Sequence, residues 1–418
     1  MFATACSRPA PLSPPATQEQ ATRSATLEQA IQKGARASTP EGLSRELQRT
    51  SAWIQSGRLE AADRLYRTAI ASKPEDPAVL SLGGDLAMAR GDYQAAARLY
   101  GRAFERRPGD PGTFLRLYEA YLIVAPGKAL TLATRVAASM PDSPGAQLCV
   151  AEACVFDVVT RRLQGVALED RLRTAKRAVE RCQSLGGSGT ADADGVRGEI
   201  AFLEARFSES ARYFQAALKG SIPNADRASD MANALALVRF RANDLAGARA
   251  AVQRHQSIVA SDRSVSGFRM LPKWEQGCFY RLVLLGEPVS RALLHQKEAD
   301  YQSLRSLGVN EFPESLHTRK LLWKLYDLRG SGRFREAAAL ARDELRPQTD
   351  APRYAPACFY SKMVDEPMYT LMLTTLLGDL ERDGGRPAAA RAAYRQALAL
   401  APASNVLRDR IHSLGGAP

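Results

Sequence analysis

Cysteine and histidine supply the side chains that most readily hold a metal ion or act as a nucleophile, and this 418-residue chain contains few of either. The cysteines lie at positions 6, 149, 154, 182, 278 and 358, and the histidines at 255, 295, 317 and 412. No two cysteines form a C-x-x-C pair, and no group of these residues has the spacing of a zinc site. We therefore predict no metal site and interpret the last five cysteines as small core residues.

Motifs for phosphate transfer and acyl transfer are incomplete or missing. The stretch APGKAL contains a Gly-Lys pair, but a phosphate-binding loop also needs glycine and Ser/Thr at the positions that Leu122 and Ala129 occupy. The chain contains neither H-E-x-x-H nor G-x-S-x-G. Neighbouring carboxylates such as Glu75 and Asp76 fall in predicted turns, where acids cap helix starts. The sequence therefore predicts a protein that is not an enzyme and has no cofactor.

The elements that carry these residues are predicted to be helices. Hydrophobic residues make up 45% of the chain and charged residues 24%, as in soluble globular proteins. Alanine and arginine are abundant, and both favour helices. Few stretches alternate Val, Ile, Thr and aromatic residues at the period of a strand. We therefore predict an all-α fold.

The formal charge of +12 arises from 57 basic and 45 acidic residues. It has two interpretations: a GC-rich genome enriches alanine and arginine without a functional cause, or the surface binds an anionic partner such as an acidic protein, lipid head groups or nucleic acid. The basic residues are scattered and alternate with acids, as in ERCQSL and LERDGG. This pattern argues against a nucleic-acid site.

Two stretches repeat one pattern in the same register: GRLEAADRLYRTAIASKPEDP at 57–77 and GDYQAAARLYGRAFERRPGDP at 91–111. In the first, Ala62, Tyr66 and Ala69 lie at i, i+4 and i+7, on one face of a helix. The glycine before each helix allows a tight turn, and the proline after it stops the helix. Each copy is therefore predicted to be a helical hairpin, and hairpins must stack because one alone cannot bury its apolar face. We expect Tyr66, Tyr100 and Tyr394 to be buried between helices.

This pattern resembles the tetratricopeptide repeat. The matching residues near the start of the chain are Leu80, Gly84, Ala96, Tyr100, Ala103 and Pro108. A copy near the other end, LLGDLERDGGRPAAARAAYRQALALAP, matches at Leu377, Gly378, Gly385, Ala390, Tyr394, Ala397 and Pro402. The copies between them are degenerate. The resemblance implies a solenoid, or superhelix, of about seven or eight helical hairpins.

Composition divides the chain into six segments. Residues 1–40 are rich in Pro, Ser and Thr and poor in large apolar residues, which predicts a flexible tether. The Gly/Ser-rich stretch 183–195 is interpreted as a linker that acts as a hinge between two stacks, and 261–315 as a helical insertion or a drifted repeat. The other segments are predicted to be an N-terminal repeat array at 41–182, middle hairpins at 196–260 and a C-terminal array at 316–418.

The resemblance implies a concave groove lined by the first helices of the hairpins, which in this family commonly holds an extended peptide or a partner helix. The hairpin register predicts that the groove is lined by Asp85, Met88, Leu115, Glu119, Arg319, Leu322 and Tyr326. The alternative for each residue is an ordinary solvated helix face. The resemblance thus predicts a scaffold that binds protein partners, and it gives no oligomeric state.

The first residues, MFATAC, resemble the cleavage box of a bacterial lipoprotein, with small residues before Cys6 and a Pro-rich stretch after it. They depart from that pattern because Ala3 stands where leucine is usual and only five residues precede the cysteine, with no charged or apolar region. Either Met1 lies inside a longer signal peptide, so that Cys6 receives lipid, or Cys6 is an ordinary residue of a disordered tail.

These observations leave three functional hypotheses. The first is a lipid-anchored scaffold in a bacterial cell envelope that helps to assemble or hold a membrane-associated complex. The second is a soluble cytoplasmic scaffold or regulatory subunit. The third is an enzyme that uses the insertion at 261–315, which an enclosed pocket with clustered ionisable groups would indicate.

Overall fold

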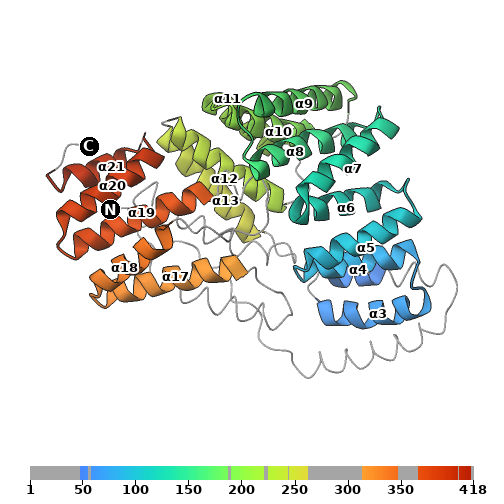
Figure 1. Ribbon diagram of the computed structural model, residues 1–418, viewed down its shortest axis with the longest axis horizontal. Helices are drawn as coiled ribbons and strands as arrows, with labels where there is room; N and C mark the ends of the chain where they lie inside the picture. Colours follow the sequence, from blue (N-terminus) through green and yellow to red (C-terminus); the bar gives the residue numbers. More distant parts are fainter. Residues whose placement is uncertain are drawn as a thin grey trace.

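The computed structural model describes residues 48–54, 58–186, 190–220, 225–242, 244–261, 313–346, 366–402 and 404–415. All regular secondary structure in these ranges is helical, which confirms the predicted all-α fold (Figure 1). The predicted tether at 1–40, with Cys6, and most of the predicted insertion at 261–315 lie outside the described residues.

Helices follow one another along the chain with short turns between them. After a short helix at 48–54, the first run contains α3 (Leu59–Ser72), α4 (Pro77–Ala89), α5 (Tyr93–Arg106), α6 (Pro111–Val124), α7 (Pro126–Ser139), α8 (Pro144–Arg161), α9 (Gly165–Ser184), α10 (Thr190–Leu203), α11 (Phe207–Lys219), α12 (Ala225–Arg241) and α13 (Leu245–Ser261). The second run contains α17 (Pro313–Gly330), α18 (Phe334–Leu345), α19 (Glu366–Asp383), α20 (Pro387–Leu400) and α21 (Asn405–His412).

Consecutive helices pack against each other as hairpins throughout both runs. Pairing the helix at 48–54 with α3, and each later helix with its successor, gives eight hairpins among the described residues, followed by the single helix α21. This agrees with the prediction of about seven or eight hairpins. The architecture is a helical-hairpin solenoid.

The first helices of three successive hairpins begin in the same way. Asp76, Asp110 and Ser143 each precede a proline, and each side chain accepts a hydrogen bond from a backbone N–H in the first turn of α4, α6 or α8. The distance is 2.8 Å from Thr113 N to the Asp110 carboxylate. The cap satisfies an N–H that has no partner within the helix, and proline at the first position lacks such an N–H. These caps fix where each first helix starts and therefore which residues share a face.

A glycine on the first helix and an aromatic ring on the second hold three of the hairpins together. The pairs are Gly84 with Tyr100, Gly198 with Phe214, and Gly378 with Tyr394, and all three have the same spacing along the chain. A Cβ atom at any of these glycines would overlap the ring; at Gly198 it would lie 2.8 Å from Cδ1 of Phe214. Only glycine therefore allows the ring to seat on the helix backbone.

The predicted burial of the tyrosines is confirmed at two positions of three. Tyr100 and Tyr394 are 2% and 0% exposed. Tyr66 is half-buried, and its ring lies against Gly83. In the α6–α7 hairpin the sizes are exchanged, because buried Tyr118 stands one repeat after Gly84 and the second helix carries alanines at its buried positions.

The predicted linker at 183–195 is shorter in the structure. Helix α9 continues to Ser184 and α10 begins at Thr190, so the second half of the predicted linker is helical. Helix α10 also packs against α8 and α9, as in a continuous stack. Gly195 contributes to packing instead of to a loop, since a Cβ atom there would overlap the side chain of Met231 on α12.

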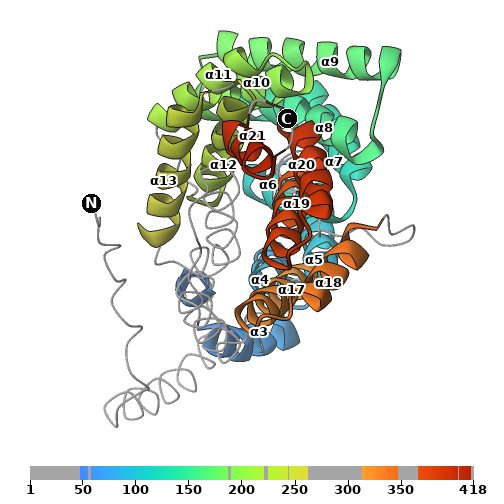
Figure 2. The same cartoon turned by 90° about the vertical axis from the view of Figure 1, so that its left-hand side faces the viewer.

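The first helices of the hairpins lie on the inside of the curved stack and the second helices on the outside (Figure 2). The contacts agree with this arrangement: α6 contacts α8 and α8 contacts α10, whereas each second helix mainly contacts its own first helix and the next one. Closer spacing of the first helices bends the stack toward them, so their free faces form the inner surface.

Candidate functional site

Three first helices, α4, α6 and α8, carry matching residues at three registers along the inner surface of the stack. We define the inner face as nine residues that occupy the same three registers in successive repeats: Ala78, Ser81 and Asp85 on α4; Gly112, Leu115 and Glu119 on α6; and Gly145, Leu148 and Glu152 on α8. One row contains small residues, the next contains Ser, Leu and Leu, and the third contains only carboxylates. We call this third row, Asp85, Glu119 and Glu152, the carboxylate row.

Asp85 is held by a tyrosine from its own hairpin and by an arginine from the next. The Tyr100 hydroxyl donates to Oδ1 of Asp85 at 2.6 Å, and Nε of Arg116 lies 3.0 Å from the same oxygen. Burial raises the pKa of Asp85, while the hydrogen bonds from Tyr100 and Arg116 oppose the rise. Burial, together with the Asp85 carboxylate, raises the pKa of Tyr100 as well, so its hydroxyl keeps its proton. Both carboxylate and tyrosine are therefore already satisfied within the protein.

Glu152 is held in a similar way, by residues from more distant helices. The Tyr118 hydroxyl shares its proton between Oε2 of Glu152, at 3.1 Å, and the Cys149 carbonyl, at 2.9 Å. Arg227 on α12 reaches back to Oε1 of Glu152 at 2.7 Å and also pairs with Asp192 on α10, at 3.0 Å. One guanidinium thus joins α8, α10 and α12 on the inner surface.

Glu119, between these two, is the open member of the carboxylate row. It is solvent-exposed, and within the part of the chain that the structure describes its carboxylate has no hydrogen bond or ion pair. Protein atoms around it restrict its hydration and raise its pKa, and the nearby Glu152 and Asp85 carboxylates act in the same direction. The guanidinium groups of Arg227 and Arg116 oppose the rise from a greater distance than an ion pair.

Leu115 lies one helix turn before Glu119 on α6. It is 45% exposed, which is unusual for a large apolar side chain in the described part of this protein. The middle of the inner face therefore carries a free carboxylate beside a free apolar side chain.

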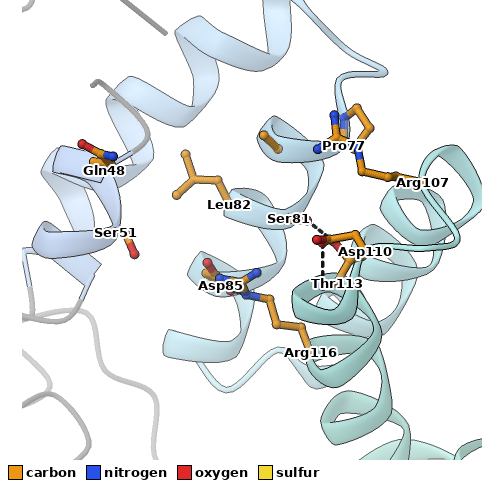
Figure 3. Close-up of a pocket in the computed structure, with 11 residues that line it drawn as sticks. Gln48, Ser51, Pro77, Ser81, Leu82, Asp85, Arg107, Asp110, Thr113 and Arg116 are labelled. Atoms are coloured by element: carbon orange, nitrogen blue, oxygen red, sulfur yellow. Dashed lines mark hydrogen bonds and ion pairs between the residues drawn. The ribbon is translucent and has the colours of Figure 1, made fainter. Parts of the chain in front are cut away.

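A cavity of about 280 Å³ adjoins this region, between the helix at 48–54 and helices α4 and α6 (Figure 3). Its lining mixes polar and apolar surface and consists of Gln48, Ser51, Pro77, Ala78, Ser81, Leu82, Asp85, Arg107, Asp110, Thr113 and Arg116. The Thr113 hydroxyl and backbone N–H hold the Asp110 carboxylate and lower its pKa. The cavity extends the inner face past α4 and has room for a side chain of a bound segment.

The predicted groove residues lie in different environments. Asp85, Leu115 and Glu119 lie on the inner face, and Met88 is half-buried against the core. In the second run of helices, Leu322 is 1% exposed and belongs to the core, so it lines no open surface. Tyr326 is half-buried against the same core.

Two of the sequence-predicted residues cannot be placed by their side chains. Arg319 lies on α17, outside the residues whose side chains are described. The predicted lipid-attachment residue, Cys6, lies outside the described residues altogether.

The prediction missed Arg116, Glu152 and Arg227. Glu152 was detectable, because it stands one repeat after Glu119 and continues the same row. The ion pair between Glu152 and Arg227 joins helices that are far apart in the sequence, and no local pattern indicates it.

Two kinds of chemistry, metal binding and thiol reactivity, depend on the geometry and the environment of side chains in the described ranges. No group of three or more His, Cys, Asp or Glu side chains there has the geometry of a metal site. Cys149, Cys154 and Cys182 are buried free thiols. Burial raises the pKa of Cys154 to about 11, which keeps this thiol protonated and unreactive. Among the described helices, none combines the length and apolarity needed to cross a membrane.

Comparison with protein families supports the interpretation of the repeats. One model of the tetratricopeptide repeat matches residues 54–111 and 171–263, and a second matches residues 375–404. The chain therefore contains tetratricopeptide repeats in these ranges. Proteins built from these repeats bind other proteins and are typically non-catalytic. No protein of curated function matches the chain in sequence.

Three solved structures illustrate the similarity of this chain to known structures. A chain of the APC/C hetero-tetramer Cut9-Hcn1 superposes with a TM-score of 0.51 at 9% identity, covering 91% of this chain and 64% of that one. The apo quorum sensor NprR from B. thuringiensis gives a TM-score of 0.45 at 13% identity, covering 91% of this chain and 93% of that one. A thermophilic tetratricopeptide-repeat protein from Thermus thermophilus gives 0.40 at 18% identity, covering 48% of this chain and 98% of that one. The first of these supports the solenoid fold.

Proposed function

We propose that this tetratricopeptide-repeat protein is a non-enzymatic scaffold that binds an extended segment of a partner protein on the inner face of α4, α6 and α8. The observation that supports this most directly is the open middle of that face. Leu115 and Glu119 project from α6 without partners in the described structure, while the side chains around them are packed or ion-paired. Protein interfaces combine apolar contacts with polar and charged ones, so an open apolar side chain beside an open carboxylate suits a protein-binding surface.

Site-specific photocrosslinking tests this proposal. A photoreactive amino acid replaces Leu115 on the inner face or, as a matched control, Val166 at the start of α9, which is 72% exposed. Both positions are exposed and apolar, so neither replacement should disturb folding. We expect position 115 to give one dominant crosslinked protein in cells of the native organism and position 166 to give none. Equal labelling from both positions would contradict the proposal.

We also propose that the scaffold is tethered to a membrane through lipid on Cys6, with the Pro-rich stretch after it as a spacer. This proposal rests on the sequence around Cys6 alone. About 35 residues of extended Pro-rich chain would reach roughly 100 Å at about 3.1 Å per residue. Such a reach would let the solenoid bind a partner that lies away from the membrane surface. The alternative is a soluble cytoplasmic scaffold, and membrane fractionation of wild type and Cys6→Ser distinguishes the two.

A further inference from the structure

The charges of the solenoid are divided between its inner and outer helices. With Lys and Arg taken as +1 and Asp and Glu as −1, the inner helices α4, α6, α8 and α10 sum to −4. The outer helices α5, α7, α9 and α11 sum to +7. The basic surplus of the chain is therefore absent from these inner helices, which have the opposite sign.

Within the carboxylate row, some carboxylates are already paired inside the protein and one is open to a partner. Two residues hold the carboxylate of Asp85: a tyrosine 15 positions later and an arginine 31 positions later. The same pattern recurs at Asp379, which accepts from Tyr394 at 2.6 Å and pairs with Arg410 at 3.3 Å. The pattern is incomplete after Glu119.

The repeat that begins at α6 is one residue shorter, so the corresponding positions after Glu119 are Ala133 and Cys149, which provide neither a phenol nor a cation. Both side chains are buried in the core. The structure thus saturates the carboxylates on either side of Glu119 and leaves this one for an external group. A cation from outside would also offset the repulsion by Glu152 that raises the pKa of Glu119.

We propose that the partner segment carries a lysine or arginine that pairs with Glu119 and, beside it, an apolar side chain that packs on Leu115. Charge complementarity indicates that the partner segment is basic. An acidic segment would be repelled by inner helices of net charge −4. A basic segment could pair with Glu119, the member of the carboxylate row that has no ion pair within the described ranges. This inference rests on the proposed function, because it specifies the partner of the same inner face.

Peptide selection with the full-length protein tests the inference. A random peptide library displayed on phage is selected against the wild-type chain, and the enriched peptides are synthesised and measured by fluorescence anisotropy. We expect enriched sequences to contain Lys or Arg within one or two positions of a Leu, Ile, Met or Phe. Glu119→Gln should weaken their binding by about 10-fold, Glu119→Lys should weaken it further, and affinity should fall as salt is added.

The control variant is Glu105→Lys, on the outer helix α5, where the side chain is exposed. It makes the same change of charge as Glu119→Lys and should leave binding unchanged. Folding is not at risk in Glu119→Gln, because Glu119 has no stabilising partner in the described structure and Gln removes a charge whose raised pKa makes it unfavourable there. Circular dichroism checks that each variant is folded.

The outcomes separate this inference from the proposed function. Peptides that lose binding on Leu115→Arg but show no basic preference would support the inner face as a binding surface and overturn the basic partner. Peptides that bind equally to Leu115→Arg, Glu119→Lys and wild type would overturn both. Enrichment of acidic peptides would also overturn the inference.

Discussion

A glycine-to-alanine change on α19 tests how the hairpins are held together. An alanine at Gly378 would place Cβ in overlap with the Tyr394 ring, at 2.9 Å from Cζ and closer still to two other ring atoms. The ring cannot retreat easily, because Tyr394 is 0% exposed and its hydroxyl is bonded to Asp379. Gly378→Ala should therefore force a shift of packed helices.

The expected magnitude is a difference of two opposing effects. Helix propensity alone favours alanine over glycine by about 1 kcal/mol in a helix interior. Overpacking of a filled core costs about 1–3 kcal/mol. We therefore expect Gly378→Ala to destabilise the protein by up to about 2 kcal/mol, in spite of the better helix former.

A second substitution, at Tyr394, should abolish the destabilising effect of Gly378→Ala. Tyr394→Ala removes the ring and should cost about 3–5 kcal/mol through lost burial and the cavity left behind. In that background nothing opposes the new methyl group, so Gly378→Ala should become neutral or stabilising by up to about 1 kcal/mol. The control is Gly127→Ala on α7, where a Cβ atom would meet nothing within 4 Å.

Urea unfolding of the full chain, followed by circular dichroism, gives these differences, and hydrogen exchange of α19 and α20 locates them. Because repeat arrays do not always unfold in one step, midpoints are compared between variants at constant slope. If Gly378→Ala is as well tolerated as Gly127→Ala, the ring does not seat on Gly378. If the penalty persists in Tyr394→Ala, its cause lies elsewhere.

Three further predictions concern ion pairs, pH and anchoring. Arg410→Met should lower the stability of the chain by about 1–3 kcal/mol, because buried Asp379 loses one of its cations, whereas Arg98→Met on the exposed surface of α5 should have no effect in urea unfolding. Binding of basic peptides should weaken as the pH falls, beginning above the ordinary glutamate value of 4.5 because the pKa of Glu119 is raised, and a pH titration of Glu119→Gln should lack this step. With its native upstream region, wild type should fractionate with membranes and Cys6→Ser with the soluble fraction, and recovery of both as soluble would contradict lipid anchoring.

The sequence predicts the hairpins well because their contacts are local and repeat. Gly84 and Tyr100 lie on adjacent helices joined by a short turn, so the repeated spacing alone indicates that they meet. The helix starts are equally local, since each cap contacts an N–H two or three positions away. The predicted linker at 183–195 was too long because a Gly/Asp-rich stretch can also be a first helical turn that packs closely.

The inner surface is harder to predict because it depends on how the hairpins curve. The register that gives exposed Leu115 on α6 gives buried Leu322 on α17. On α17 the neighbouring Leu321, Leu325 and Leu328 are also buried, so the apolar face is wide and includes the position that is open on α6. Sequence register therefore indicates which residues are equivalent, whereas packing decides whether each is free.

Helix α21 reproduces the first turns of a repeat without completing it. Ser404 caps it as Asp110 caps α6. Arg410 stands at the position of Arg116, at the same distance along the chain from the carboxylate that it neutralises. Leu407 and Ile411 are its buried residues.

Helix α21 thus presents the docking side of a repeat to α19 and α20 and leaves its other side polar. For protein engineering, this repeated docking side allows further hairpins to be added to the array. A hairpin with an arginine, a carboxylate and a tyrosine at the registers of Arg116, Asp85 and Tyr100 could be inserted between α20 and α21 with the same type of junction on both sides.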